Sequence, residues 1–544
     1  MIKNSQILAR TLLLALITTS LGVTPFISFE PINIPRFCLL TIFSCALIFI
    51  LPSKYFREQF TKIKIYLVLC TIYISLITFS MIRSNLPITD GIFGVSGRNT
   101  GILTYLGLSV LMITAILSSS RWLNEKLYHS FILIGLLNGI YALIQHFGYD
   151  VFDWVNPYSP IIGLLGNPNF LSSYLGMTSI LLLNLTLNSK FFSGKNALLI
   201  SIQIILVYLI LASKSIQGLL VLCIGASFLI FIKIRNSFLR KYQLAFVFLV
   251  FLITFLMALD IFQKAPWKSF LYKESVSFRG DFWRAGFNMF RNNPILGLGP
   301  DSYRDNFRFY RDLTAVGRNS NVPVDSAHNF FIDVASSGGI FLLITYLTMV
   351  YLTLRASILI IRRNSKDSNV IGLIALWIAY LAQSIISVGQ ISILVWGWAI
   401  SGAIIGHCLQ LNSDIRSIPK QNAIKFLKLR ITAGILVGIS LSYPLFKADR
   451  DFRKALNIGQ IELIKNEIDQ WPQQVSYRNT SSLIMRNAGF NIQALEISRD
   501  SVKKFPKNYE AWREIYLNPI TPYSEKQRAF EKLKILDPLN PNHN

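Results

Sequence analysis

Long apolar stretches dominate the chain and are separated by short polar segments. A helix that crosses a bilayer needs roughly 20 mostly apolar residues, and the chain contains about 13 stretches of that kind. The alternation of a membrane β-barrel is absent. The pattern therefore predicts an all-α, polytopic membrane helix bundle, with spans near 8–29, 35–52, 63–82, 101–119, 128–147, 171–188, 197–213, 217–233, 243–262, 336–354, 369–388, 391–410 and 430–447.

The first apolar stretch follows Lys3 and Arg10 and is similar to a signal peptide. No clear small-x-small cleavage site accompanies it, and further spans follow, so we expect an uncleaved span. All five cysteines lie in or beside predicted spans, and no CxxC pair occurs. This arrangement indicates neither a disulfide framework nor a zinc site.

Charge distribution gives the expected orientation. The net charge is +25, yet only 15% of residues are charged, against about 25% in a typical soluble domain. With the N-terminus inside, the inner loops hold most of the basic residues, and the short outer loops hold only Arg36, Arg83, Arg98 and Lys214. This is the positive-inside pattern. We therefore expect a cytoplasmic N-terminus, an extracytoplasmic C-terminus and no nucleic-acid partner.

Two polar segments stand apart from the spans. The loop at about 263–327 is predicted on the outer side, and its excess of basic residues suggests an anionic ligand; a solvated helical cap is the alternative. From 448 the chain is polar, and "WPQQVSYR" is followed 34 residues later by "FPKNYEAWR". This period resembles tetratricopeptide repeats, which often bind protein partners. A small helical domain resting on the membrane part is the other interpretation.

His328 lies where the long loop enters a span, three residues after Asp325. A neutral imidazole oriented by that carboxylate is a candidate general base. The alternative makes Asp325 a helix N-cap and His328 a packing residue. In "FRGDFWRAGFNMF", Arg279 and Trp283 share a helix face, and the Arg279 guanidinium suits phosphate oxygens. A salt bridge from Arg279 to Asp281 or Glu274 is the competing explanation.

The outer segments also gather uncommon polar groups at the membrane interface, where such groups are functional candidates. These segments are "GVSGRNTG", "GLLGNPNFLSSYLG", "SKSIQG" and "VDSAHNFFIDVASSGGIFLL". Their polar residues include Arg98, Asn167, Asn169, Lys214 and Gln217.

Taken in order, "GRNTGILTYL", "GNPNFLSSYL", "RGDFW…NPILGLG" and "DSAHNFFIDVASSGGI" resemble the O-antigen ligase (Wzy_C) superfamily of bacterial membrane glycosyltransferases. The resemblance covers roughly 90–360. It implies a transmembrane domain over 1–447, with a helical-repeat domain over 448–544, both the active site and the repeats being extracytoplasmic at the bacterial inner membrane.

The resemblance also implies an activity. A glycan moves from an undecaprenyl-diphosphate-type carrier to an acceptor hydroxyl on a glycan, lipid or protein. Neither a metal nor another cofactor is needed, because basic residues bind the diphosphate. His328 and Arg279 become the catalytic residues. Arg98, Lys214, Arg279, Asn167 and Asn169 become the diphosphate-binding set, supported by Asp325, Gln217 and Trp283.

One segment departs from the family pattern. Many members carry a Ser-Arg pair at the head of the eighth span, where this chain reads "ASKSIQGLL". Lys214 supplies a point charge there rather than a planar fork. A polysaccharide polymerase and a protein O-oligosaccharyltransferase share these motifs. A polysaccharide or lipid transporter is disfavoured, because the middles of the spans carry almost no ionisable groups.

Overall fold

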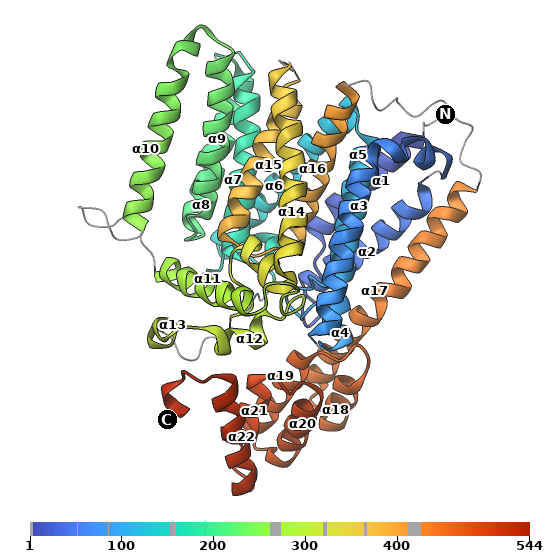
Figure 1. Cartoon of the computed structure of the whole chain (residues 1–544), viewed down its shortest axis with the longest axis vertical. Helices are drawn as coiled ribbons and strands as arrows, with labels where there is room; N and C mark the ends of the chain where they lie inside the picture. Colours follow the sequence, from blue (N-terminus) through green and yellow to red (C-terminus); the bar gives the residue numbers. More distant parts are fainter. Residues whose placement is uncertain are drawn as a thin grey trace.

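A computed structural model describes residues 4–51, 53–84, 86–152, 154, 159–190, 192–261, 274–318, 324–363, 367–411 and 426–543. Over these residues all regular structure is helical, with 22 α-helices and three short 3₁₀ helices. Figure 1 shows a bundle of long, roughly parallel helices, with shorter helices gathered at one end beside the C-terminus. The predicted all-α membrane bundle is confirmed.

The long helices follow the predicted apolar stretches. Ten of the described helices are long and apolar enough to cross a membrane, while α1 and α5 are shorter. α10 occupies the place of the ninth predicted span. The chain is an integral membrane protein, and the total of about 13 spans remains a prediction. The bundle comprises α1 (Asn4–Leu21), α2 (Asn33–Ile50), α3 (Ser53–Arg83), α5 (Ile102–Ser118), α6 (Arg121–His146), α7 (Pro168–Leu187), α8 (Gly194–Ala212), α9 (Gln217–Arg235), α10 (Gln243–Ile261), α14 (Phe330–Arg362), α15 (Ser368–Ile386), α16 (Ile391–Leu411) and α17 (Leu427–Ile458).

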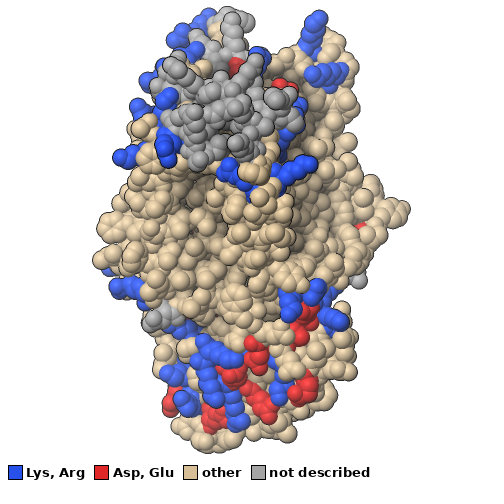
Figure 2. All heavy atoms as spheres, turned by 90° about the vertical axis from the view of Figure 1, so that its right-hand side faces the viewer, with Lys and Arg blue, Asp and Glu red and all other residues tan. Residues whose placement is uncertain are grey.

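Burial separates the centre of the bundle from its edge. The apolar window of α16 is 89% buried, whereas those of α3 and α17 are 22% buried. Figure 2 shows a broad band almost without charged side chains between two charged ends, as a membrane-embedded surface requires. At one end basic residues predominate, and at the other, over the C-terminal helices, basic and acidic residues are mixed.

Short helices connect and cover the bundle. They are α4 (Ile88–Phe93), η1 (Gly163–Leu165), η2 (Phe238–Tyr242), α11 (Glu274–Asn292), α12 (Tyr303–Tyr310) and α13 (Leu313–Arg318). α11 runs across the end of the bundle (Figure 1). Residues 263–273 and 319–323 of the predicted loop lie outside the described residues. Asp281 joins α11 to α13 by accepting from Arg318 at 2.7 Å, so part of the loop's positive charge is balanced internally.

The helix that follows this loop differs from its prediction at the N-terminus. The apolar stretch predicts a span from 336, but α14 begins at Phe330 and is broken at Gly339, where φ is 72°. Asn329 caps α14 by accepting from the N–H groups of Phe331 and Ile332. The interpretation of Asp325 as the N-cap is therefore wrong, because the intervening residues are not helical.

The break in α14 is paired with the "NPILGLG" segment. The N–H groups of Leu298 and Gly299 donate to the carbonyls of Ser336 and Ser337, both at 2.8 Å. Gly297 has φ of 64°, and a Cβ there would lie 2.4 Å from the Ser337 carbonyl carbon. Only glycine fits this close backbone approach, which fixes the loop against the head of α14.

Gly297→Ala is expected to lower the melting temperature of the detergent-purified protein. The left-handed backbone costs a non-glycine residue roughly 1–2 kcal/mol, and the Cβ clash adds to this. Gly317→Ala is the matched control, because its Cβ meets nothing within 4 Å and it lies in helix α13. Equal melting temperatures for the two variants would contradict this account.

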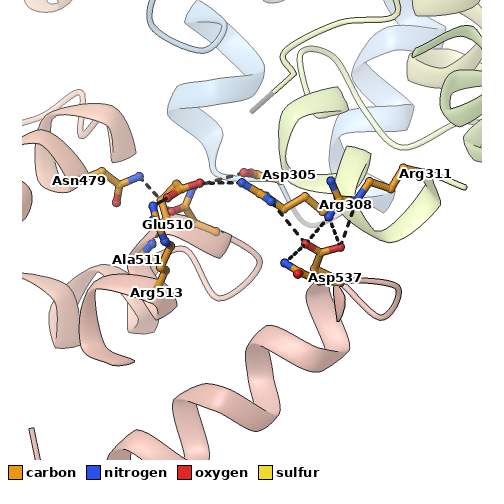
Figure 3. Close-up of polar contacts among 10 residues, drawn as sticks. Asp305, Arg308, Arg311, Asn479, Glu510, Ala511, Arg513 and Asp537 are labelled. Atoms are coloured by element: carbon orange, nitrogen blue, oxygen red, sulfur yellow. Dashed lines mark hydrogen bonds and ion pairs between the residues drawn. The ribbon is translucent and has the colours of Figure 1, made fainter. Parts of the chain in front are cut away.

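The C-terminal segment forms antiparallel helix pairs that follow α17. They are built from α18 (Ile461–Asp469), α19 (Val475–Asn487), α20 (Asn491–Lys504), α21 (Tyr509–Leu517) and α22 (Tyr523–Leu536), ending in η3 (Pro541–His543). The starts of α19 and α21 are separated by the predicted 34 residues. The assignment of the C-terminal segment to tetratricopeptide repeats remains a prediction. Figure 3 shows Asp537 of this segment contacting Arg308 of α12 and Arg311, which directly follows α12.

Candidate active site

The loop between α4 and α5 is folded around one buried carboxylate. Asp301 Oδ2 accepts from the backbone N–H groups of Val95 and Thr100, both at 3.1 Å. Gly94 has φ of 79°, and a Cβ there would lie 2.6 Å from the same oxygen. The "GVSGRNTG" and "GLGPD" segments are thus parts of one structure, which fixes the position of Arg98.

Arg98 lies among three carboxylates. Its guanidinium is 3.7 Å from Asp301 and 4.0 Å from both Asp325 and Asp333, and its side chain is 11% exposed. Its Nη1 also donates to the Asp325 carbonyl at 3.2 Å. Burial opposes the charge, but the carboxylates outweigh burial and raise the pKa of Arg98. The positive charge of Arg98 is therefore already balanced within the protein.

His328 has a strained backbone, with φ of 51°. A bulky residue with positive φ is uncommon and is typical of functional sites. Its N–H donates to Ser326 Oγ at 3.2 Å, and its ring lies 5.4 Å from that of Phe282 on α11. Burial lowers the pKa of His328 to about 4; Asp325 opposes this shift, and Arg279 and Arg98 add to it. The imidazole is neutral at neutral pH.

Arg279 projects from α11 and acts electrostatically on His328. Burial lowers its pKa, but a guanidinium keeps its charge in proteins. Asp281 binds Arg284 and Arg318 instead of Arg279, and the Glu274 side chain lies outside the described residues. Among the side chains that are described, Arg279 forms no ion pair. A basic group without a carboxylate partner is suited to an anionic ligand.

Trp283 lies one helical turn after Arg279 on α11, as predicted. Its indole N–H is buried and has no acceptor among the described residues. A buried donor normally has a partner. The Arg279 side of α11 therefore offers both a positive charge and an unused hydrogen-bond donor.

A cavity of about 270 Å³ opens beside His328. It is lined by residues at the N-terminal ends of three helices, Asn33 of α2, Asn167 of α7 and Gln390 before α16, and by His328 just before α14. Asn167 is the N-cap of α7, directly before Pro168 in the first turn. Helix N-termini carry a partial positive charge. Arg98 and Asp325 also line the cavity.

The remaining predicted residues form a neighbouring cluster at the head of α9. Ser215 Oγ donates to Asn169 Oδ1 at 2.7 Å, and Ser173 Oγ donates to Gln217 Oε1 at 3.3 Å. Lys214 is exposed and has φ of 61°. None of Lys214, Asn169 and Gln217 is among the described residues that line the cavity. The two amides instead hold α7 against α9.

Several polar residues of this region were not predicted from the sequence, among them Asp301, Asp333 and Gln390. Asp301 and Asp333 lie within the motifs, and their position around Arg98 depends on contacts distant in sequence. Gln390 lies outside the motif-bearing part of the chain. The one sequence feature that pointed to Gln390 was its position as a polar residue between two strongly apolar spans.

Comparison with known proteins gives one family match. Residues 201–347 match the family model described as O-antigen ligase (Wzy_C). No curated protein matches the chain. The matched range runs from α8 to α14 and contains both Arg279 and His328. Residues 201–347 of this integral membrane protein are thus similar to the O-antigen ligase (Wzy_C) family.

Proposed function

We propose that the protein is a membrane glycosyltransferase that moves a glycan from a polyprenyl diphosphate to an acceptor hydroxyl, as an O-antigen or polysaccharide ligase does. The observation that carries the proposal is the neutral His328 imidazole, held beside a cavity and within the field of Arg279. The family match over residues 201–347 supports the same reaction class.

In the proposed reaction the acceptor approaches His328 from the cavity, and the diphosphate of the donor lies on the side of Arg279. The acceptor hydroxyl enters the cavity and gives its proton to the imidazole as its oxygen attacks the anomeric carbon. The bond from that carbon to the diphosphate oxygen breaks, and its electron pair leaves with the diphosphate. Negative charge grows on the leaving group, where the Arg279 guanidinium stabilises it more in the transition state than in the ground state.

Within the proposed diphosphate set we give Arg279 the leading role. Arg98 is surrounded by carboxylates that repel an added anion, so we assign it to fixing the loop and the head of α14. Asn167 lines the cavity that receives the acceptor, so we place it on the acceptor side of His328 and not with the diphosphate. Lys214 and the supporting Gln217 lie at the start of α9, and Asn169 lies in the first turn of α7 beside them; there they would contact a more distant part of the donor.

Two exposed apolar side chains, one on α11 and one shortly after its end, would contact the lipid part of the donor. Phe287 is 58% exposed and Ile295 is 60% exposed at the end of the bundle. Figure 2 shows basic residues predominating at the other end, which supports a cytoplasmic location for that end. The site and the C-terminal helices then face the outside of a bacterial inner membrane.

The direct test uses the purified protein in nanodiscs. Its donor is lipid-linked glycan extracted from a strain that lacks the gene, and its acceptor is the glycolipid fraction of the same strain. We expect glycan transfer with stoichiometric release of polyprenyl diphosphate. Intact donor after incubation with the wild-type protein would overturn the proposal.

Arg279→Lys is expected to reduce turnover in this assay about tenfold or more while the amount of inserted protein is unchanged. Lysine keeps the charge but loses the planar fork that binds two phosphate oxygens at once. Arg291→Lys, an exposed site near the end of the same helix, is the control and should retain activity. If both variants are equally active, the guanidinium fork is not required.

A further inference from the structure

Gln390 is a buried amide that the proposed mechanism does not use. It lies between α15 and α16, and its backbone carbonyl accepts from the N–H groups of Ile393 and Leu394, both at 2.9 Å. These bonds fix its backbone at the first turn of α16. The residue is 4% exposed and lines the cavity beside His328.

Neither amide atom of Gln390 has a hydrogen-bond partner among the described residues. Asn33, which lines the same cavity, donates through Nδ2 to the Gly97 carbonyl at 2.7 Å, but its buried Oδ1 lacks a partner within the described chain. Buried polar atoms are normally satisfied. The cavity is the space from which a ligand can supply the missing bonds.

The groups that line the cavity favour a neutral ligand over an anion. Arg98 is balanced by its carboxylates. Asp325, one of these carboxylates, itself lines the cavity. The Glu30 carboxylate also lines it and accepts from the N–H groups of Asn33 and Ile34 at the start of α2. Glu30 already occupies the N-terminus of α2, and the full charges of the two carboxylates oppose a phosphate more than the partial charges of the other helix N-termini attract it. Hydroxyl groups, by contrast, pair well with amide donors and acceptors.

The cavity also has the size and the wall that a sugar ring needs. Its volume of about 270 Å³ is near the lower end of the roughly 300–1,000 Å³ range for small-molecule sites. Phe170 adds an apolar wall to the polar lining. Arg279 is not among the described residues that line this cavity, so the cavity and the Arg279 side of His328 are distinct.

We propose that this cavity is the acceptor subsite, in which Gln390 and Asn33 bind hydroxyl groups of a carbohydrate ring beside the His328 imidazole. The inference rests on the proposed function and adds the residues that select the acceptor. A pyranose held by Gln390 has a neighbouring hydroxyl within the same cavity as His328. Gln390 then determines which ring, and which hydroxyl of it, reacts.

The test compares Gln390→Leu, which removes both amide atoms at nearly constant volume, with Gln383→Leu. Gln383 is 2% exposed in α15 and is not among the described residues that line the cavity. Dissociation constants are measured in nanodiscs for two probes, the glycolipid fraction of a strain lacking the gene and bare undecaprenyl diphosphate. Gln390→Leu is expected to weaken glycolipid binding about tenfold and to leave undecaprenyl diphosphate binding unchanged. Gln383→Leu should change neither constant.

The outcomes separate this inference from the proposed function. Unchanged glycolipid binding by Gln390→Leu overturns the subsite, as does a loss confined to undecaprenyl diphosphate. Gln390-dependent glycolipid binding without glycan transfer by the wild-type protein would refute the reaction and support the subsite. A wild-type protein that binds neither probe would refute both.

Discussion

His328→Asn is expected to reduce glycan transfer about 10²–10⁴-fold, which is the usual contribution of a general base. Asparagine is chosen because it adopts positive φ more readily than other side chains, and His328 has φ of 51°. The substitution removes the imidazole without adding backbone strain. Turnover is measured in nanodiscs, together with the melting temperature, which should stay close to that of the wild type.

The control for this variant is His129→Asn on α6. His129 is exposed, and its ring Nδ1 lies 2.8 Å from the Glu125 carbonyl of its own helix. We expect wild-type turnover from this variant. Normal transfer by His328→Asn would exclude His328 as the base, even if Arg279 proved essential.

The pH dependence follows from the burial of His328. Its pKa is about 4, below the ordinary value of 6.5, so the base is unprotonated over most of the acidic range. The acid limb of kcat/KM should therefore fall near pH 4 rather than near 6.5. Arg279→Gln removes a positive charge that lowers the pKa of His328. The pKa should therefore rise, and the acid limb should move to higher pH. A limb that stays in place would mean that Arg279 does not act on His328.

The spans were predictable because a bilayer imposes length and hydropathy on each helix separately. The start of α14 was not, since Asp333 and Ser336 interrupt the apolar run after its first residues and Gly339 breaks the helix. At that break, backbone carbonyls of α14 accept hydrogen bonds from the N–H groups of Leu298 and Gly299. Such pairing between a loop and a helix head has no period in the sequence.

The sequence allowed us to predict which segments form the candidate site, but not which side chains contact each other within it. The motifs containing Arg98, Asn167 and His328 do meet at one cavity. No pattern in the sequence indicates that Asp301 and Asp333 surround Arg98. Side chains separated by more than 200 residues are brought together only by packing, and that packing decides which arginine remains without a carboxylate partner.

The C-terminal helices were also predictable only in part. Their 34-residue offset was visible in the sequence, whereas their attachment to the loop was not. Asp537 is 0% exposed and accepts from Arg311 Nη2 at 2.8 and 2.7 Å. Arg308, which lies 3.4 Å from Asp537, also pairs with Glu510 and stacks on the Tyr509 ring (Figure 3). This network ties α22 and α21 to α12, in the same loop as α11 and Arg279.

Asp537→Ala is expected to destabilise this attachment by about 3–5 kcal/mol, because it removes one partner of a buried ion pair and leaves guanidinium charge in a dry interface. Thermal unfolding and limited proteolysis of the detergent-purified protein measure the effect, and glycan transfer should fall because α12 supports the loop that carries Arg279. Glu496→Ala is the control, since its pair with Lys465 is half-exposed and such pairs contribute about 0–1 kcal/mol. Equal melting temperatures and protease resistance in the two variants would show that the C-terminal helices are held by their apolar contacts instead.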